Sequence, residues 1–436
     1  MFERLVMTQQ RRSAGFRLAA LAIPTVAALA LTGCGGSSSS ASDAENQEFS
    51  LTFATSNTVE SPYEALAKQY MQEFPDVKIT LNPQPNDSYD QVVRTQLQAG
   101  NASDVLVTSP GSASGRSILP LVEAGFLEPL SESAAALVPE GSEALFGPDG
   151  KVYGLAPEIT VVGLVNNDTA SAAAGVNAFP EDFAGVLEQC GVLAADNKSM
   201  FAVAGTAAPN TGLLGMQLAA TRVYSKDPDW NDKRAAGDVT FAGTEGWQQA
   251  LEAVVDLKDA GCFQKGAEGA GFDVVTKALV GGDSLAAFIP GPSNKQLKTT
   301  AEDQDFEVRV LPSEGGPDED FIYASANYAY SINAASKNKD AATTFLEWLA
   351  EPEQTKAFAE IDGALPVTGL EDFDFANSAY KNVADLVLNN RYAPLPNSEW
   401  SNASVYDELG TGVQGLLTGQ QTPAQVLEAM DAAWDQ

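Results

Sequence analysis

Cysteine is the one residue type in this sequence whose position suggests a covalent reaction. Cys34 comes directly after Leu31-Thr32-Gly33 and directly before two glycines and a run of serines. Arg11, Arg12 and Arg17 form a basic flank before an apolar segment, residues 18–31, which is too short to span a bilayer. A basic flank followed by a short apolar run predicts an export signal over residues 1–33. We therefore expect the rest of the chain to lie outside the cytoplasm.

The tetrapeptide that ends in Cys34 resembles the bacterial lipobox. In that motif the thiol receives a diacylglycerol, the chain is cut before the cysteine, and the new amino end is acylated. Several acyl chains anchor a protein stably, whereas one would not. The resemblance implies lipidation of Cys34, a flexible tether over residues 34–47, and attachment to the extracytoplasmic face of the cell membrane. The alternative is an ordinary signal peptide in which Cys34 is incidental.

The composition excludes several classes of function. The chain has 58 acidic and 25 basic residues, and the part after Cys34 is more acidic still, because four of the basic residues precede it. Nucleic acid and anionic membrane surfaces are poor partners for such a charge. There is no histidine, the commonest general base and metal ligand. We therefore expect no catalytic residues, no bound metal and no cofactor.

The remaining two cysteines, Cys190 and Cys262, lie in the middle of the chain. In an exported protein they are able to form a disulfide, and we expect that bond. Two buried free thiols are the alternative.

The segments that follow the tether alternate between strand and helix patterns. Strand-forming runs occupy residues 49–55, 77–81 and 105–107, and apolar residues at helical spacing occupy 61–74 and 89–99. Such alternation is typical of an α/β fold whose mainly parallel sheet is covered by helices. About 390 residues after the tether exceed what one core usually serves, so two domains are expected.

Polar side chains follow the ends of two of these strands. Ser56 and Asn57 follow the first strand, and Thr108 and Ser109 follow the strand at 105–107. In open α/β sheets ligands bind outside the carboxyl ends of the strands, which makes these four residues candidates for ligand contact. Capping of the next turn or helix is the alternative role for them.

Three blocks of sequence carry a family resemblance. The first combines Glu-Ala-Gly-Phe-Leu-Glu-Pro-Leu (123–130), Asp-Gly-Lys-Val-Tyr-Gly-Leu (149–155) and Val-Asn-Asn-Asp (165–168); the others are residues 330–349 and 417–423. In this order they resemble the extracellular solute-binding proteins of ABC importers, in the carbohydrate-binding branch known as family 1. The resemblance covers nearly the whole chain after Cys34.

The resemblance implies a two-lobed periplasmic-binding-protein-like fold of type II, with a ligand cleft between lobes joined by hinge crossings. Carried over, lobe 1 is residues 48–157 plus 309–362, and lobe 2 is residues 158–308 plus 363–436. The implied partners are a small solute, most often a carbohydrate, and the permease subunits of an ABC importer in the membrane. The implied oligomeric state is a monomer.

Five residues are singled out as ligand contacts by their place in this family pattern. Trp400 lies in a loop before a helix, where a stacking aromatic residue is expected; a core tryptophan is the alternative. Glu158 stands at the first lobe crossing, and Asn327 and Tyr328 stand at the second. Ser293 follows a Gly-Pro turn after which the family has a tryptophan, so one stacking platform is missing and the class of sugar is left open.

The sequence also permits other functions. A secreted enzyme acting on glycosides would need a pair of carboxylates, which so acidic a chain cannot reveal by composition. A structural or adhesive lipoprotein of the cell envelope would lack a cleft that closes on a solute. A metal-binding importer protein is disfavoured by the lack of histidine.

Overall fold

The computed structural model describes residues 47–55, 61–85, 88–139 and 141–436. The predicted export signal, Cys34 and the tether up to residue 46 lie outside the described residues, as do Ser56 and Asn57. In the described part of the chain, no helix is both long enough and apolar enough to cross a membrane.

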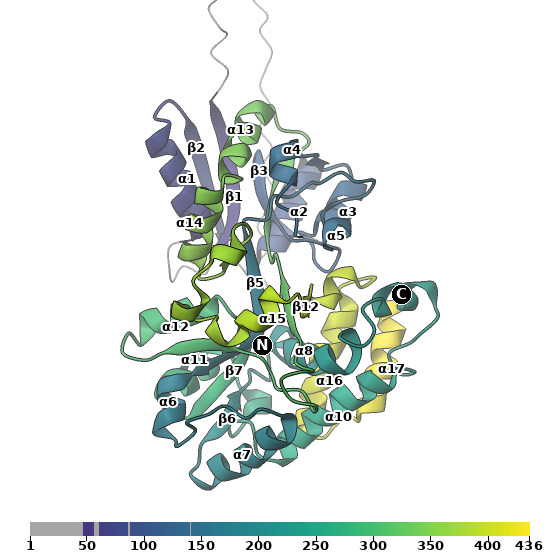
Figure 1. Ribbon diagram of the computed structural model, residues 1–436. Coiled ribbons are helices and arrows are strands. Elements are labelled where there is room, and N and C mark those ends of the chain that lie inside the picture. The colour runs from purple at the N-terminus through teal and green to yellow at the C-terminus, as the bar shows by residue number, and fades with distance from the viewer. Residues whose placement is uncertain (1–46, 56–60, 86–87, 140) are drawn as a thin grey trace, which may run out of the picture. The chain divides into compact units, whose positions relative to one another are not determined.

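The first sheet is built mainly from the amino-terminal part of the chain, as the strand and helix patterns predict (Figure 1). Its strand order is β2-β1-β3-β10-β4. β1 pairs in parallel with β2 and β3, while β10 runs antiparallel to β3 and β4. The bounds are β1 Glu48–Thr55, β2 Lys78–Pro85, β3 Val105–Thr108, β4 Leu127–Glu128 and β10 Ala329–Asn333.

Helices bury one core against this sheet. Phe49, Leu51 and Phe53 of β1 pack with Tyr63 of α1 and Phe345 of α13. The bounds are α1 Pro62–Glu73, α2 Tyr89–Ala99, α3 Ile118–Glu123, α4 Glu132–Ala135, α5 Glu143–Phe146, α13 Lys339–Leu349 and α14 Pro352–Asp362. The alternating apolar residues of β1 thus build the core that the sequence pattern predicts.

The second sheet is arranged around β5, the longest strand, every residue of which is buried. Its main strand order is β12-β9-β5-β7-β6, and β8 and β11 also pair with β5. A strand of ten buried residues, Glu158–Asn167, is expected where helices cover both faces of a sheet. The other bounds are β6 Ser199–Ala202, β7 Ser284–Pro290, β8 Phe306–Arg309, β9 Ile322–Ser325, β11 Leu365–Pro366 and β12 Tyr392–Ala393.

A separate core belongs to this second sheet and its helices. The carboxyl-terminal helices α16 and α17 pack beside α8 and α10, as Figure 1 shows in yellow and teal. The bounds are α6 Asp168–Ala173, α7 Phe183–Ala195, α8 Ala208–Ala219, α9 Trp230–Ala236, α10 Glu245–Asp259, α11 Phe272–Gly281, α12 Ser293–Thr300, α15 Ala384–Leu388, α16 Ser404–Thr418 and α17 Pro423–Trp434. Short turns of helix are η2 Ala220–Tyr224, η3 Ala267–Gly269, η4 Leu370–Asp372, η5 Phe375–Asn377, η6 Lys381–Val383 and η7 Pro396–Glu399.

The chain passes between the two sheets three times, and one of these passages differs from the sequence-based prediction. It enters the second sheet at β5, returns between β9 and β10, and leaves the first sheet again between α14 and β11. The family resemblance places residues 309–325 in the first lobe, but β8 and β9 pair with β5. The physical reason is that this segment supplies strands that complete the second sheet. The return to the first lobe therefore falls near Ala326.

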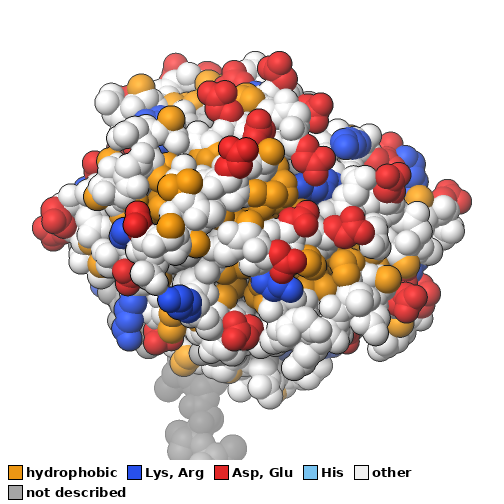
Figure 2. Space-filling view, turned by 90° about the horizontal axis from the view of Figure 1, so that it is seen from below, with side chains coloured by type: hydrophobic (Ala, Val, Ile, Leu, Met, Phe, Trp, Pro, Cys, Tyr) orange, Lys and Arg blue, Asp and Glu red, His pale blue; other side chains and the backbone are white. Residues whose placement is uncertain are grey.

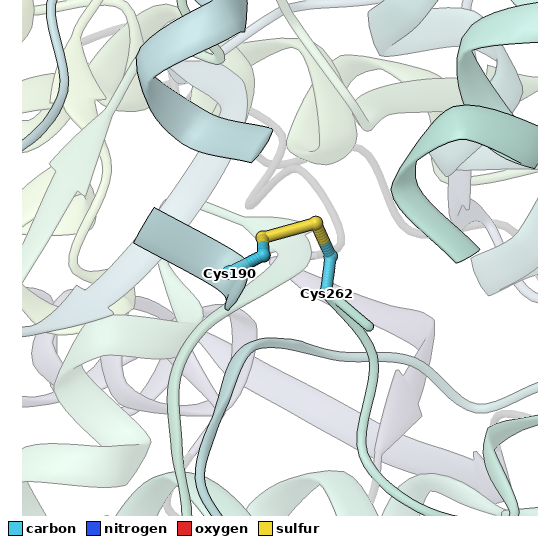
Figure 3. The surroundings of a disulfide bond; sticks show 2 residues. All are labelled: Cys190 and Cys262. Carbon is cyan, nitrogen blue, oxygen red and sulfur yellow. A yellow bond between two sulfur atoms is a disulfide. The ribbon is translucent and has the colours of Figure 1, made fainter. Parts of the chain in front are cut away.

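Cys190 and Cys262 form a disulfide in the second lobe (Figure 3). Both residues are fully buried, and the bond joins α7 to the segment after α10. The expected disulfide is therefore present in the structure, and free thiols at these two positions are not.

Candidate functional site

A cavity of about 430 Å³ lies where the ends of the two sheets meet. Such a volume is in the range of small-molecule sites. The first lobe and the loop that leads into it contribute Ser109, Pro110, Ala113, Ser114, Arg116, Ala326, Asn327 and Tyr328. The second lobe contributes Thr160, Val162, Pro209, Asn210, Leu213, Phe272, Ile289, Pro290, Ser325, Leu395, Asn397, Ser398 and Tyr406.

Strand ends place much of this lining, as the topology argument predicts. Ser109 follows β3, Ser325 ends β9, and Pro290 ends β7. The hydroxyl Oγ of Ser109 lies 3.2 Å from that of Ser114 in the next turn. Asn327 lies in the loop between β9 and β10. The strand ends therefore bring hydroxyl and amide groups to one cavity, which suits a polar solute.

Aromatic side chains contribute apolar surface to the same cavity. Phe272 opens α11 and is 50% exposed, although it is a large apolar residue. Tyr328 and Tyr406 also line the cavity. The ring of Tyr406 is held by its hydroxyl, which donates to the carbonyl oxygen of Pro209 at 2.9 Å. An exposed phenyl ring beside polar groups is the combination with which proteins bind a sugar ring.

Arg116 is the cationic residue of this cavity. Its Nε lies 3.0 Å from Oδ1 of Asp90, and its guanidinium carbon lies 4.6 Å from the ring centre of Tyr328 and 5.0 Å from that of Tyr89. The Nη1 atom is buried and has no hydrogen-bond partner in the described part of the chain. Two rings and a carboxylate thus hold the guanidinium while leaving a donor unused.

A direct contact joins the two lobes at one end of the cavity. The backbone N–H of Ser112 donates to the carbonyl oxygen of Ser398 at 2.9 Å, and its hydroxyl donates to that of Trp400 at 2.9 Å. Gly111 permits this approach, because a Cβ atom there would lie 2.1 Å from the carbonyl oxygen of Ser398. The backbone of the two loops therefore bounds the cavity.

Glu158 lies at the hinge, beneath the cavity rather than in its lining. It is 2% exposed; its carboxylate accepts a hydrogen bond from the hydroxyl of Thr160 at 2.9 Å and one from the backbone N–H of Asn327 at 3.3 Å. Burial, with a further contribution from Asp362, raises the pKa of Glu158 to about 8. The residues concerned come from all three passages between the sheets, so Glu158 connects the hinge segments.

Two of the predicted contact residues belong to other surroundings. Thr108 is fully buried, and its hydroxyl lies 2.7 Å from that of Ser331 in β10, so it joins neighbouring strands. Ser293 opens α12 and lines a different cavity, of about 450 Å³, together with Lys295 and Asp362. The cavity described above therefore includes Ser109, Asn327 and Tyr328 of the predicted set, but neither Thr108 nor Ser293.

Trp400 does not line the cavity, contrary to the expected stacking role. Its side chain is fully buried, and its ring centre lies 5.4 Å from that of Phe241 and 6.2 Å from that of Trp247. Its Nε1–H donates to Oδ1 of Asn231 at 3.2 Å. The loop before α16 turns this side chain into the second core, where an apolar cluster and a hydrogen-bond partner accommodate it.

Sequence reasoning missed Arg116 and Phe272, the two residues that distinguish this cavity. Arg116 lies in a Gly-Arg-Ser stretch without periodicity, and Phe272 sits in an amphipathic pattern that normally assigns a phenylalanine to the core. A glycine before Phe272 was the available signal, since Gly271 is the residue before the first turn of α11. Within the described residues, no cluster of three or more histidine, cysteine or acidic residues is arranged to hold a metal ion.

Comparison with known proteins gives a sequence relative that matches over most of its length and solved structures of similar fold. A binding protein of Brucella abortus (strain 2308) is 25% identical over 416 residues, which cover 90% of this chain and 93% of that protein. The solved structure of the solute-binding protein RafE in complex with raffinose has a TM-score of 0.72 at 19% identity, covering 89% of this chain and 98% of that one. A chitin oligosaccharide binding protein has a TM-score of 0.72 at 21% identity, covering 88% and 98%.

These structural likenesses show the two-lobed α/β fold of type II. The family is shown by sequence, because the pattern described as bacterial extracellular solute-binding protein matches residues 54–356, well over half of the chain. An extracytoplasmic place and a solute-binding role accompany that family. With a cavity between two sheets and this match, the chain belongs to the bacterial extracellular solute-binding proteins.

Proposed function

We propose that this protein captures a sugar in the cavity between its lobes and delivers it to the permease of an ABC importer. The observation that carries the proposal is the lining itself: an exposed phenyl ring, Phe272, stands beside the hydroxyl and amide side chains of Ser109, Ser325 and Asn327. Sugars present hydroxyls around an apolar ring face, and this lining offers a partner for each.

The solved relatives support a sugar as the solute. One is bound to raffinose, one is a chitin oligosaccharide binding protein, and one from Thermotoga lettingae is bound to α-D-tagatose, with a TM-score of 0.71 at 16% identity, covering 89% of this chain and 98% of that one. We therefore take the ligand contacts to be Ser109, Asn327, Tyr328 and Phe272. In this proposal Glu158 connects the hinge segments and does not contact the sugar.

The proposed setting follows from the sequence. Lipidation of Cys34 would hold a monomer at the outer face of the cell membrane, with the tether, residues 34–47, giving reach to the permease. The lobes are residues 48–157 with 326–362, and 158–325 with 363–436, and closure of one lobe on the other would present the loaded form.

Filling the cavity provides the test. Ala113 lines the cavity, and its methyl side chain makes no hydrogen bond. The variant Ala113→Trp should abolish the rise in melting temperature that a bound sugar produces in a screen of mono- and oligosaccharides. Ala236→Trp, the same change at an exposed position at the end of α9, should leave the rise intact. A sugar that still stabilises Ala113→Trp would place its site elsewhere.

A further inference from the structure

The charge in the cavity is opposite to the charge of the protein. The whole chain carries a net charge of −33, and acidic side chains are spread over the face seen in Figure 2, with basic ones less frequent between them. Among the residues that the structure describes, however, no aspartate or glutamate lines the cavity, and Arg116 is its one charged side chain. The chain is so acidic that a cavity lined by an arginine and by no carboxylate differs from the rest of its surface, and it would attract an anion rather than a cation.

Arg116 is held in place before any solute arrives. Its Nε forms an ion pair with the carboxylate of Asp90, and the rings of Tyr89 and Tyr328 pack against the guanidinium. The Arg116 side chain is 12% exposed, whereas that of Asp90 is 37% exposed. Because the carboxylate of Asp90 is the more exposed partner and is screened by water, it offsets the charge of Arg116 only in part. A guanidinium fixed in this way loses little conformational entropy when a ligand binds.

Two polar atoms of the lining residues also lack partners within the described structure. Nη1 of Arg116 is a donor, and Oδ1 of Asn397 in the second lobe is an acceptor; both are buried. A buried polar atom without a hydrogen bond is costly, so each gains from a solute that supplies the complement. The complement of a guanidinium N–H is an anionic oxygen, and the complement of an amide oxygen is a hydroxyl.

We infer that the solute is an anionic saccharide, whose carboxylate, sulfate or phosphate group binds Arg116 while its hydroxyls bind the amide of Asn397. This inference rests on the proposed function and narrows its substrate class. Carboxylates in the lining would accept the hydroxyls of a neutral sugar but would repel an acidic one. Their absence from the described lining and the presence of Arg116 thus favour the same class of solute.

Calorimetric titration with matched pairs of probes tests the inference on the purified protein. The pairs are D-galacturonate and D-galactose, D-glucuronate and D-glucose, D-glucose 6-phosphate and D-glucose, and sialyllactose and lactose. We expect an anionic member to bind at least tenfold more tightly than its neutral partner. The identity of that member distinguishes a carboxylate from a phosphate as the bound group.

Arg116→Gln should weaken binding of the anionic member at least tenfold and change that of the neutral member less than threefold. Arg94→Gln makes the same change of charge at an exposed position of α2 and should leave both affinities unchanged. Arg116→Lys keeps the charge but not the planar fork, and should retain part of the preference. If Arg116→Gln fails to fold, the inference is still tested by the preference of the wild-type protein for the anionic members and by the effect of Arg116→Lys on that preference.

Neutral members that bind as tightly as their anionic partners would overturn the inference and leave the proposed function standing. If Arg116→Gln lowers the affinity for both members of a pair equally, the inference is also overturned and the proposed function still stands. If no member of any pair binds, the proposed function fails together with the inference.

Discussion

Two groups of aromatic residues in this protein look alike in sequence and differ in their surroundings. The first is the Trp400 cluster, composed of Trp230, Phe241, Trp247 and Trp400, whose side chains are all buried with at most 1% exposed. The second is the cavity group, composed of Phe272, Tyr328 and Tyr406. Within the first group each ring contacts other rings, whereas Phe272 leaves half of its surface free.

The contrast shows that an aromatic residue near a hinge is assigned to a core or to a site by its partners and not by its place in a loop. Trp400 is buried because α9 and α10 bring Asn231 and Trp247 to it from far along the chain. Phe272 stays exposed because it is the first residue of α11 and lines the cavity.

The largest expected effect is on the Trp400 cluster. Trp400→Ala should lower the free energy of unfolding by about 3–5 kcal/mol, because it leaves a cavity among packed rings and removes the hydrogen bond to Asn231. Denaturant unfolding measures the change. Solute affinity, measured well below the melting temperature, should remain near that of the wild type. A variant of normal stability that no longer binds the solute would show instead that Trp400 contacts the ligand.

Glu158 extends the comparison to a polar group, because it is buried beneath the cavity and not exposed in it. Its pKa of about 8 lies above the value of about 4.5 for an unfolded chain, so the folded state holds the proton more tightly. The resulting stabilisation is fully present below about pH 4.5 and is lost as the pH rises through about 8. Glu158→Gln, which resembles the protonated acid, should remove this loss, of about 2–4 kcal/mol.

Thermal melting of both forms between pH 5 and about pH 9 measures this effect. The wild type should lose stability relative to Glu158→Gln as the pH rises. Parallel curves for the two proteins would show that Glu158 is ionised in the folded state throughout.

The sequence was sufficient for features that depend on local pattern. The alternation in β1, the helix that begins at Pro62 and the Gly100 that ends α2 all follow from neighbouring residues. The cysteine pairing followed from compartment and count. The two-lobed fold followed from a resemblance spread along the chain, and a likeness of fold does not fix individual contacts.

Features that depend on distant partners were not predictable in this way. The family pattern places residues 309–325 in the first lobe, yet β9 pairs with β5, a strand more than 150 residues earlier in the chain. Thr108 stands at a strand end, as predicted, but β10 covers it from more than two hundred residues away. The guanidinium of Arg116 is held by Tyr89 and Tyr328, and no spacing in the sequence predicts that these three residues come together.

Gly111 tests whether the contact between the two loops matters for binding. Gly111→Ala places a Cβ atom 2.1 Å from the carbonyl oxygen of Ser398 and at a φ of +78°, so the loops must separate. We expect solute affinity to fall by about 1–2 kcal/mol, since part of the contact that bounds the cavity is lost. Gly125→Ala has a similar φ, +73°, with no atom within 4 Å of its Cβ. That control carries the backbone strain without the clash, so equal effects in calorimetry would contradict this role of Gly111.

The smallest expected effect concerns Phe272, and it reverses the forecast for Trp400. Phe272→Ala removes a ring that is half exposed, so the free energy of unfolding should change by less than about 1 kcal/mol. Affinity for the sugar should fall by about 1 kcal/mol, the range of a single stacking contact. Leu388→Ala, at a residue of α15 that is 51% exposed, removes a similar apolar surface away from the cavity. Calorimetry on both variants separates the cases, because a loss of affinity shared by Leu388→Ala would come from the protein as a whole, and an unchanged affinity in Phe272→Ala would leave the sugar face to Tyr328 or Tyr406.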